Sequence, residues 1–181
     1  GDFTVAYEQF EYDDDGNMTK RTVAATGEEI NYEWSDYNRL LKVTSTVNGV
    51  LQENKYDIDG IRDRKTDKNG NTAIEYPIGY MTTASRPRNA SSNAPKISYI
   101  QGPNGFLGYE EDGQMRYFVL DALQSVTNIV DSSKNVVQSY QYDEWGNHMS
   151  GSGTGSVQSP KTYWGGLSVN DETADTGLYL A

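Results

Sequence analysis

The chain of 181 residues contains no cysteine, a single histidine and only five prolines, and each shortage excludes a class of structure or chemistry. Without cysteine there is no disulfide bond and no thiol chemistry. A zinc site built on His148 alone would need an unusual set of carboxylate partners. We therefore interpret His148 as a surface residue beside a turn, because no nucleophile-elbow motif supports a Ser-His-Asp triad.

Positive charge is also scarce, since 15 Lys and Arg face 26 Asp and Glu and give a formal net charge of −11. Binding to nucleic acid needs clustered Lys and Arg, so the sequence predicts no nucleic-acid partner. An anionic membrane surface is disfavoured for the same reason. No apolar run approaches the roughly 20 residues that a membrane helix needs, so we predict no membrane insertion. No signal peptide is visible at the start.

Aromatic and turn-forming residues are abundant. Aromatics make up 12% of the chain, with 14 Tyr, and there are 18 Gly, while the mean hydropathy is −0.75. Tyr suits half-buried strand faces, because its ring packs while its hydroxyl stays hydrated. A disordered chain would be poor in aromatics, so the composition indicates ordered, turn-rich β structure.

A short motif recurs about every 22 residues near the start of the chain, in the range of known repeat architectures. It consists of an aromatic residue, an acidic turn, a Gly or Asn, and a return to β-type residues. The copies span 12–19, 34–40 and 56–62, and in the middle copy Ser35 and Asn38 replace the Asp and Gly. The repeat-motif residues, together with a later copy, are Tyr12, Asp13, Gly16, Asn17, Tyr56, Asp57, Gly60, Tyr142, Asp143 and Gly146.

The stretch 117–147 reads as three strand-like segments, at 117–120, 125–130 and 136–142, joined by turns. Between the last two lies Asp131-Ser132-Ser133-Lys134-Asn135, in which Asn135 is the expected left-handed residue. Asn48-Gly49 is the strongest hairpin signal elsewhere, and Asn104-Gly105 and Asp112-Gly113 mark two more hairpin tips. The sequence thus predicts an all-β fold, a meander of antiparallel hairpins that forms a long twisted or spiralling sheet.

We expect four regions along the chain. Residues 1–76 form the repeat hairpins, 77–96 a loop, 97–149 a group of core strands, and 150–181 a linker that leads into a C-terminal segment. The linker is assigned from the Gly- and Ser-rich run at 150–159. The acids Asp171, Glu172 and Asp175 are expected in a solvated loop.

These motifs resemble the Rhs / Tyr-Asp-repeat family, whose core ends in Tyr-Asp-Pro-aromatic-Gly-Asn after an Asp-x-Leu-Gly-Ser-Val segment. Gln124 stands where the family usually has Gly, and Glu144 stands where it usually has Pro. The tail 176–179 is similar to a Thr-Gly-Leu-Tyr signature of the family. The residues that match the core pattern are Asp121, Leu123, Ser125, Val126, Tyr142, Asp143, Trp145, Gly146 and Asn147.

The resemblance implies a segment of a hollow β shell that, in bacterial members, encloses a C-terminal toxin. The implied location is secreted or on the bacterial cell surface, and the implied partner is the rest of the parent protein with its toxin domain. With about three clear repeats the chain is too short to close a large shell, and it lacks the segment that carries self-cleavage in the family. We therefore expect a non-catalytic fragment that binds no cofactor and no metal.

Other functions stay open at this stage. The aromatic residues Trp34, Trp145 and Trp164 are candidates for stacking on a glycan or contacting a surface receptor, although a ladder of repeat tyrosines explains the pattern more simply. The Asp-rich turns fail the EF-hand template for calcium. A glycosidase or an autoprotease is the least favoured alternative, because 26 acids supply carboxylate pairs at any spacing. Open sheet edges also predict self-association.

Overall fold

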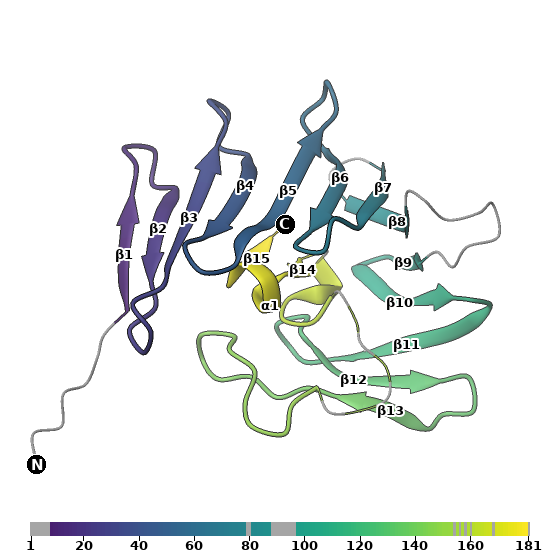
Figure 1. Ribbon diagram of the computed structural model, residues 1–181. Coiled ribbons are helices and arrows are strands. Elements are labelled where there is room, and N and C mark those ends of the chain that lie inside the picture. The colour runs from purple at the N-terminus through teal and green to yellow at the C-terminus, as the bar shows by residue number, and fades with distance from the viewer. Residues whose placement is uncertain are drawn as a thin grey trace, which may run out of the picture. The chain divides into compact units, whose positions relative to one another are not determined.

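The computed structural model describes residues 8–78, 81–87, 97–153, 155, 157, 159, 161–167 and 169–180. The chain divides into two compact units, 1–73 and 74–181, which are considered one at a time below. Among the described residues, strands β1 to β13 follow one another in chain order as an antiparallel meander (Figure 1). The predicted all-β fold is confirmed.

The first unit consists of hairpins from the repeat region. Its strands are β1 (Gln9–Tyr12), β2 (Met18–Thr22), β3 (Glu29–Trp34), β4 (Leu40–Ser45), β5 (Gly49–Tyr56) and β6 (Arg62–Asp67), and β7 (Thr72–Ile78) begins at its end. Side chains alternate between the two faces of a strand, which gives period-2 burial. In β3 this pattern buries Ile30 and Tyr32, and in the neighbouring strand β4 the side chains of Leu40 and Val43 are buried.

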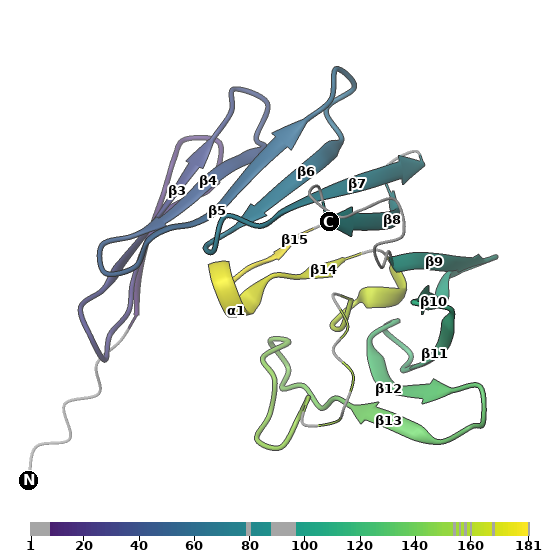
Figure 2. The same ribbon diagram turned by 45° about the vertical axis from the view of Figure 1, so that its right-hand side comes forward.

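The second unit contains the remaining strands and the C-terminal segment. Its strands are β8 (Met81–Pro87), β9 (Ile97–Gly102), β10 (Gly105–Glu111), β11 (Gln114–Leu120), β12 (Val126–Asp131) and β13 (Val136–Ser139). The short helix η1 (Gly165–Leu167) precedes the paired strands β14 (Asn170–Asp171) and β15 (Tyr179–Leu180), which are joined through α1 (Thr173–Thr176) (Figure 2).

The core of the second unit is built on four buried side chains, Tyr109, Val126, Ile129 and Tyr140. Tyr109 is fully buried and packs its ring 5.8 Å from that of Phe118. Aromatic pairs of this kind add to the energy of area burial. The core therefore joins three parts of this unit, namely β10, β12 and the chain that follows β13.

Two regions differ from the sequence-based expectation. Strand β8 lies within 77–96, which was predicted as a loop, and it pairs with β9 through Ala84–Ser98 and Ser85–Ile97. The Gly- and Ser-rich run at 150–159 is not a free linker where it is described, since the amide of Gly155 donates to Oε1 of Gln138. A small residue suits this position because a Cβ there would lie 2.3 Å from the oxygen of Val137.

In the described part of the chain, no helix has the length and apolar character needed to cross a membrane.

Candidate functional site

One turn geometry occurs seven times in the described chain. The first residue of the turn, i, exchanges backbone hydrogen bonds with residues i+3 and i+4, and its side-chain oxygen accepts from the amide of i+4. In most copies the same oxygen also accepts from the amide of i+2, which makes an Asx- or Ser-type turn. The turns begin at Asp13, Ser35, Asp57, Asp67, Asp121, Asp131 and Asp143.

The fourth residue of each turn has a positive φ. Glycine takes this position at 16, 60, 70 and 146, whereas Asn38, Gln124 and Lys134 take it with φ of 57°, 66° and 69°. Only glycine adopts this region at no steric cost. The prediction for Asn135 is wrong, because Lys134 is the left-handed residue and Asn135 instead donates its amide to Asp131. Gln124 preserves the turn despite replacing the family's glycine.

Four of the turn carboxylates, those of Asp13, Asp67, Asp131 and Asp143, have a lowered pKa. Hydrogen bonds from the side chain and backbone of Asn17 lower the pKa of Asp13, and those from Asn147 do the same for Asp143. At Asp67 burial raises the pKa, but the donors of the turn outweigh it and the net pKa is lowered. A carboxylate that accepts several N–H donors is stabilised in this way. The acids of the repeat motif therefore serve as hydrogen-bond acceptors within the turns.

Three aromatic residues that directly precede a repeat turn form a hydrogen bond to the preceding repeat. Nε1 of Trp34 donates to the oxygen of Met18 at 2.7 Å, and the hydroxyl of Tyr56 donates to the oxygen of Leu40 at 2.8 Å. In the second unit the hydroxyl of Tyr142 donates to the oxygen of Val126 at 2.7 Å. Each donor lies 16 residues after its acceptor, so the bond is a regular feature of the repeat.

Neighbouring turns of the first unit also contact each other directly. Nδ2 of Asn17 donates to Oδ1 of Asn38 at 3.0 Å. The guanidinium of Arg39 lies 5.5 Å from the ring centre of Tyr37 and 6.0 Å from that of Tyr56. It also covers Gly60, where an added Cβ would be 1.6 Å from Nη2 of Arg39. The fifth residue of one turn thus contacts the fourth residue of the next.

In the second unit an aromatic ring covers the equivalent glycine. A Cβ on Gly146 would lie 2.7 Å from the ring of Tyr163, which stacks on Trp164 at 5.3 Å. Trp164 is 43% exposed and Trp145, at the turn, is 78% exposed. A groove of about 520 Å³ in the same unit has Tyr140, Tyr142 and Tyr163 in its lining.

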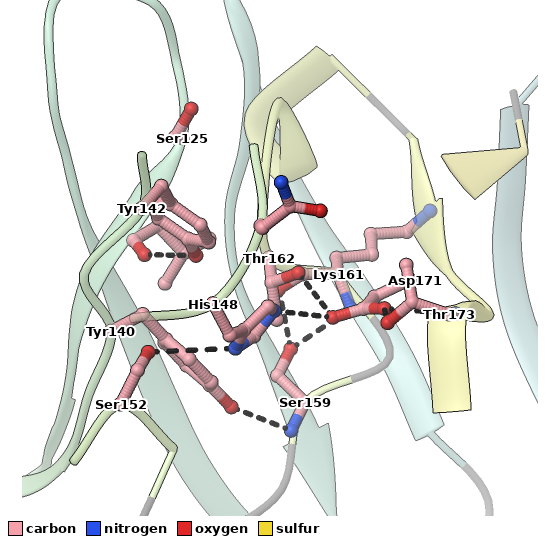
Figure 3. Close-up of polar contacts among 12 residues, drawn as sticks. Ser125, Tyr140, Tyr142, His148, Ser152, Ser159, Lys161, Thr162, Asp171 and Thr173 are labelled. Carbon is pink, nitrogen blue, oxygen red and sulfur yellow. Dashed lines mark hydrogen bonds and ion pairs between the residues drawn. The ribbon is translucent and has the colours of Figure 1, made fainter. Parts of the chain in front are cut away.

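A polar network centred on Asp171 joins the last repeat turn to the C-terminal segment (Figure 3). Oδ2 of Asp171 lies 2.9 Å from Nε2 of His148 and accepts from Oγ1 of Thr162 at 2.6 Å. Oδ1 accepts from the amide and the hydroxyl of Thr173, at 3.1 and 2.6 Å. Burial alone would raise the pKa of Asp171, but the hydrogen bonds from His148, Thr162 and Thr173 lower it to about 2.

The network brings Ser152, His148 and Asp171 into line, but the arrangement lacks features of a catalytic triad. Because an ionised carboxylate only accepts, Nε2 of His148 donates to Asp171 and Nδ1 faces the hydroxyl of Ser152 at 3.4 Å. That hydroxyl already accepts the amide of Gln141. The nearby amides of Gly153 and Gly155 donate to Ser139 and Gln138, so neither is available to an oxyanion.

Two expectations about this region change. Asp171 and Glu172 do not lie in a solvated loop, since the side chain of Asp171 is 13% exposed and Glu172 is buried. The side chain of Asp175 lies outside the described residues. His148 does sit beside a turn, but it is fixed between the rings of Tyr140 and Tyr142 as well as by Asp171.

Sequence reasoning missed Lys161 and Thr162, both fully buried. Nζ of Lys161 donates to Oδ1 of Asn170 at 3.0 Å and lies 4.8 Å from the ring centre of Tyr99. Contact with an aromatic face stabilises a desolvated ammonium group. No local motif marks either residue, because their partners are distant in sequence.

The three tryptophans are not equivalent. Trp34 belongs to the first unit, and its ring nitrogen donates to the backbone oxygen of Met18. Trp145 and Trp164 belong to the second unit. Within the residues that the structure describes, no group of three or more His, Asp or Glu side chains is placed to hold a metal ion.

Comparison with known proteins gives relatives along almost the whole chain. No family model matches. The chain is 30% identical over 174 residues to the tRNA3(Ser)-specific nuclease WapA of Bacillus spizizenii, and 29% identical to the tRNA nuclease WapA of Bacillus subtilis strain 168. Each match covers 95% of this chain.

The chain is homologous to a segment of WapA. This confirms the resemblance to the Rhs / Tyr-Asp-repeat family. The chain spans only 7% of the length of these WapA relatives, so their names describe much longer proteins.

The fold of this WapA-like segment also occurs in solved toxin structures. It matches the Photorhabdus luminescens Tc holotoxin pore with a TM-score of 0.57 at 15% identity, and the TcdB2-TccC3 crystal structure with the same values. Both matches cover 95% of this chain and 11% of the other chain. At this identity the likeness establishes a shared β-sheet fold.

Proposed function

We propose that this chain is a non-catalytic shell segment of a larger secreted or cell-surface bacterial protein that encloses and carries a toxin. The observation that carries the proposal is that the repeat-motif residues form hydrogen bonds within and between the repeats. Their carboxylates, amides and aromatic donors bond to neighbouring turns and strands, as in Tyr56 to Leu40 and Asn17 to Asn38. These groups hold repeats together and leave little chemistry for a substrate.

The tRNA nuclease activity in the WapA names is, on this proposal, the work of another part of the parent protein. A net charge of −11 disfavours contact between this segment and a polyanion such as tRNA. The partners of the segment are then the rest of its parent polypeptide and the toxin domain that it encloses.

Exchange of the matching segment of Bacillus subtilis WapA for this chain tests the proposal. We expect the chimera to be produced intact and to retain its tRNA nuclease activity, while the purified chain alone leaves tRNA uncut. A variant chimera with Tyr56→Phe and Tyr142→Phe, which removes two cross-repeat bonds, should be more sensitive to protease. Cleavage of tRNA by the isolated chain would overturn the proposal.

The exposed rings of Trp145 and Trp164 favour a second function, binding to a glycan or a surface receptor. Flat aromatic faces suit sugar rings, and the groove lined by Tyr142 and Tyr163 also carries the carboxylate of Glu144 as a hydrogen-bond acceptor. A glycan array with the wild-type chain, Trp164→Ala and the exposed control Tyr37→Ala tests this function. Binding lost only in Trp164→Ala supports it, and absence of binding by the wild type rejects it.

We also propose self-association through sheet edges. All four residues of β1 are exposed, and β1 pairs with β2 alone among the described strands. An exposed strand edge offers backbone groups to another chain. Sedimentation over a wide concentration range should reveal dimers or larger species, and a constant monomer mass would rule the idea out.

A further inference from the structure

Lys161 places a primary amine against a side-chain amide inside the second unit. The residue is fully buried, and its Nζ donates to Oδ1 of Asn170 at 3.0 Å. Two aromatic rings face the amine as well, because Nζ lies 4.8 Å from the ring centre of Tyr99 and 5.1 Å from that of Phe106. Phe106 is itself fully buried, so the amine and the amide meet where bulk water is excluded.

A second contact, one residue further along each stretch of chain, holds the two groups in register. Oγ1 of Thr162 donates to Oδ2 of Asp171 at 2.6 Å, so two successive pairs join the same two stretches. The backbone oxygen of Thr162 also accepts the amide of Val126, which anchors this stretch to the start of β12. The amine and the amide are therefore positioned by contacts on both sides.

A carboxyl group that can carry protons lies beside the same aromatic ring. Glu75 of β7 is only 9% exposed and belongs to the second unit. Burial raises the pKa of Tyr99 well above its ordinary value, and the nearby charge of Glu75 adds to this effect. Glu75 and Lys161 thus both approach Tyr99.

We propose that Lys161 and Asn170 react with each other to form an isopeptide bond, with Glu75 as the group that carries the proton. Glu75 first accepts a proton from the lysine ammonium. Nζ then bonds to Cγ of Asn170, and the bond between Cγ and Nδ2 breaks. A second proton passes from Nζ to Nδ2, which leaves as ammonia and takes up the proton that Glu75 holds.

The surroundings of the two groups favour this reaction. Two reacting groups held about 3–3.5 Å apart are close to an attack geometry, and Nζ already contacts the oxygen bonded to the carbon that it attacks. Burial favours the neutral, nucleophilic form of an amine when a carboxylate can take its proton. The aromatic walls also keep out water, which would compete as a nucleophile. All atoms of the product come from the two side chains, and no oxidation or reduction takes place.

The bond would close a covalent loop around the short helix η1. The amide of Gly166 in η1 donates to the backbone oxygen of Gln124, so the loop contacts the turn at Asp121. A cross-link of this kind stabilises a protein mainly by restricting its unfolded chain. The inference concerns a modification of this chain and does not depend on the proposed shell function.

Intact-mass measurement of the purified chain under denaturing conditions tests the bond. We expect a mass lower than that of the sequence by one ammonia. Trypsin cuts after Lys and Arg, and between Lys134 and the end of the chain Lys161 is the only such residue. An unlinked chain therefore gives separate peptides 135–161 and 162–181. A linked Lys161 resists cleavage and gives one peptide, 135–181, that lacks one ammonia.

Three variants locate the reaction at the two side chains. Lys161→Arg keeps the positive charge without a nucleophilic amine, and Asn170→Ala removes the carbon that is attacked. Both should have the full mass of their sequences. Lys134→Arg changes an exposed lysine and should still lose one ammonia.

Glu75→Gln tests the proton carrier, because it keeps the shape of the side chain and removes its basic oxygen. We expect ammonia loss to slow by about tenfold or more. Glu172→Gln changes another buried carboxyl and should leave the rate unchanged. An unchanged rate in Glu75→Gln would overturn the role of Glu75.

The wild-type chain decides the central claim, so a variant that fails to fold does not affect it. Near-ultraviolet circular dichroism shows that the wild-type sample is folded. A full sequence mass in this folded sample after prolonged incubation overturns the proposal. Loss of ammonia that maps to a peptide other than 135–181 also overturns it, as does loss that persists in Lys161→Arg.

Discussion

The hydroxyl of Tyr142 donates a hydrogen bond of 2.7 Å to the backbone oxygen of Val126, the first residue of β12. Val126 follows the turn that begins at Asp121, and Tyr142 precedes the next turn on the same side of the meander, at Asp143. The bond therefore joins two consecutive repeats through a side chain in addition to the strand ladder. The bonds from Trp34 to Met18 and from Tyr56 to Leu40 do the same in the first unit.

Removing only this hydroxyl should weaken the second unit. We expect Tyr142→Phe to lower the free energy of unfolding by about 1 kcal/mol, a typical net value for one hydrogen bond, since the ring contacts remain. Urea denaturation followed by tryptophan fluorescence measures the change. Tyr37→Phe is the matched control, because Tyr37 is 79% exposed, and an equal loss in both variants would contradict the assigned role.

Replacement of a strained left-handed residue should stabilise the protein. Lys134 has φ of 69° and is exposed, so Lys134→Gly relieves the backbone at little cost in side-chain contacts. The left-handed conformation costs an L-residue about 1–2 kcal/mol. Because glycine also raises the conformational entropy of the unfolded chain, which offsets part of the gain, we expect the free energy of unfolding to rise by up to about 1 kcal/mol. Lys134→Ala keeps the strain and should give no gain. Thermal unfolding of both variants distinguishes the two effects.

The first residue of each repeated turn should contribute more to the free energy of unfolding than its exposed neighbours do. Asp67→Ala removes the acceptor for the amides of Asn69 and Asn71 and for the side chain of Asn71. We expect a loss of about 1 kcal/mol after allowing for solvent screening. Asn69→Ala leaves the backbone amide in place and should cost less. Equal destabilisation by the two substitutions would argue against the turn geometry.

Acid should release the stabilisation that Asp171 provides. Its pKa is about 2 in the folded protein, below the value of about 3.9 for an unfolded chain, so the contribution is complete above about pH 4 and is lost as pH falls toward 2. A shift of this size corresponds to about 2.6 kcal/mol. Unfolding free energies of the wild type and Asp171→Asn, measured at intervals from pH 6 to pH 2, should converge at the acid end.

The comparison with Asp171→Asn is needed because other carboxylates titrate in the same range. The pKa values of Asp13, Asp67, Asp131 and Asp143 are also lowered by their turn donors, so both proteins lose stability in acid. Only the difference between the two proteins reports on Asp171. A difference that stays constant down to pH 2 would show that Asp171 does not titrate as expected.

The sequence sufficed for those parts of the fold that local chemistry determines. The Tyr-Asp turns at Asp13, Asp57 and Asp143 were predicted from residues within five positions of each other, and Asp112-Gly113 takes the expected pair of positive φ values. The degenerate turn at Ser35 was predicted as well, because Asn38 tolerates the left-handed region. The expectation of an all-β meander of hairpins followed from the same motifs.

The parts that failed depend on partners far away in the sequence. Asp171 was assigned to a solvated loop because the carboxylate's partners His148 and Thr162 are 23 and 9 residues distant and follow no motif. Strand β8 was missed because Pro and Arg in its sequence favour a loop, whereas pairing with β9 decides its conformation. Lys161 could not be identified as buried, since its ring contact with Tyr99 is set by packing alone.

The constant separation of 16 residues between donor and acceptor, together with the 22-residue step between the turns at Ser35 and Asp57, has an evolutionary consequence. An insertion or deletion of one whole unit keeps each aromatic donor opposite an equivalent carbonyl, while a change of length within a strand moves the donor off its acceptor. Genes for such sheets should therefore grow and shrink in whole-unit steps. Each unit gains its stability mainly from its immediate neighbours, so a lineage can change the size of the assembly without redesigning the segments it keeps.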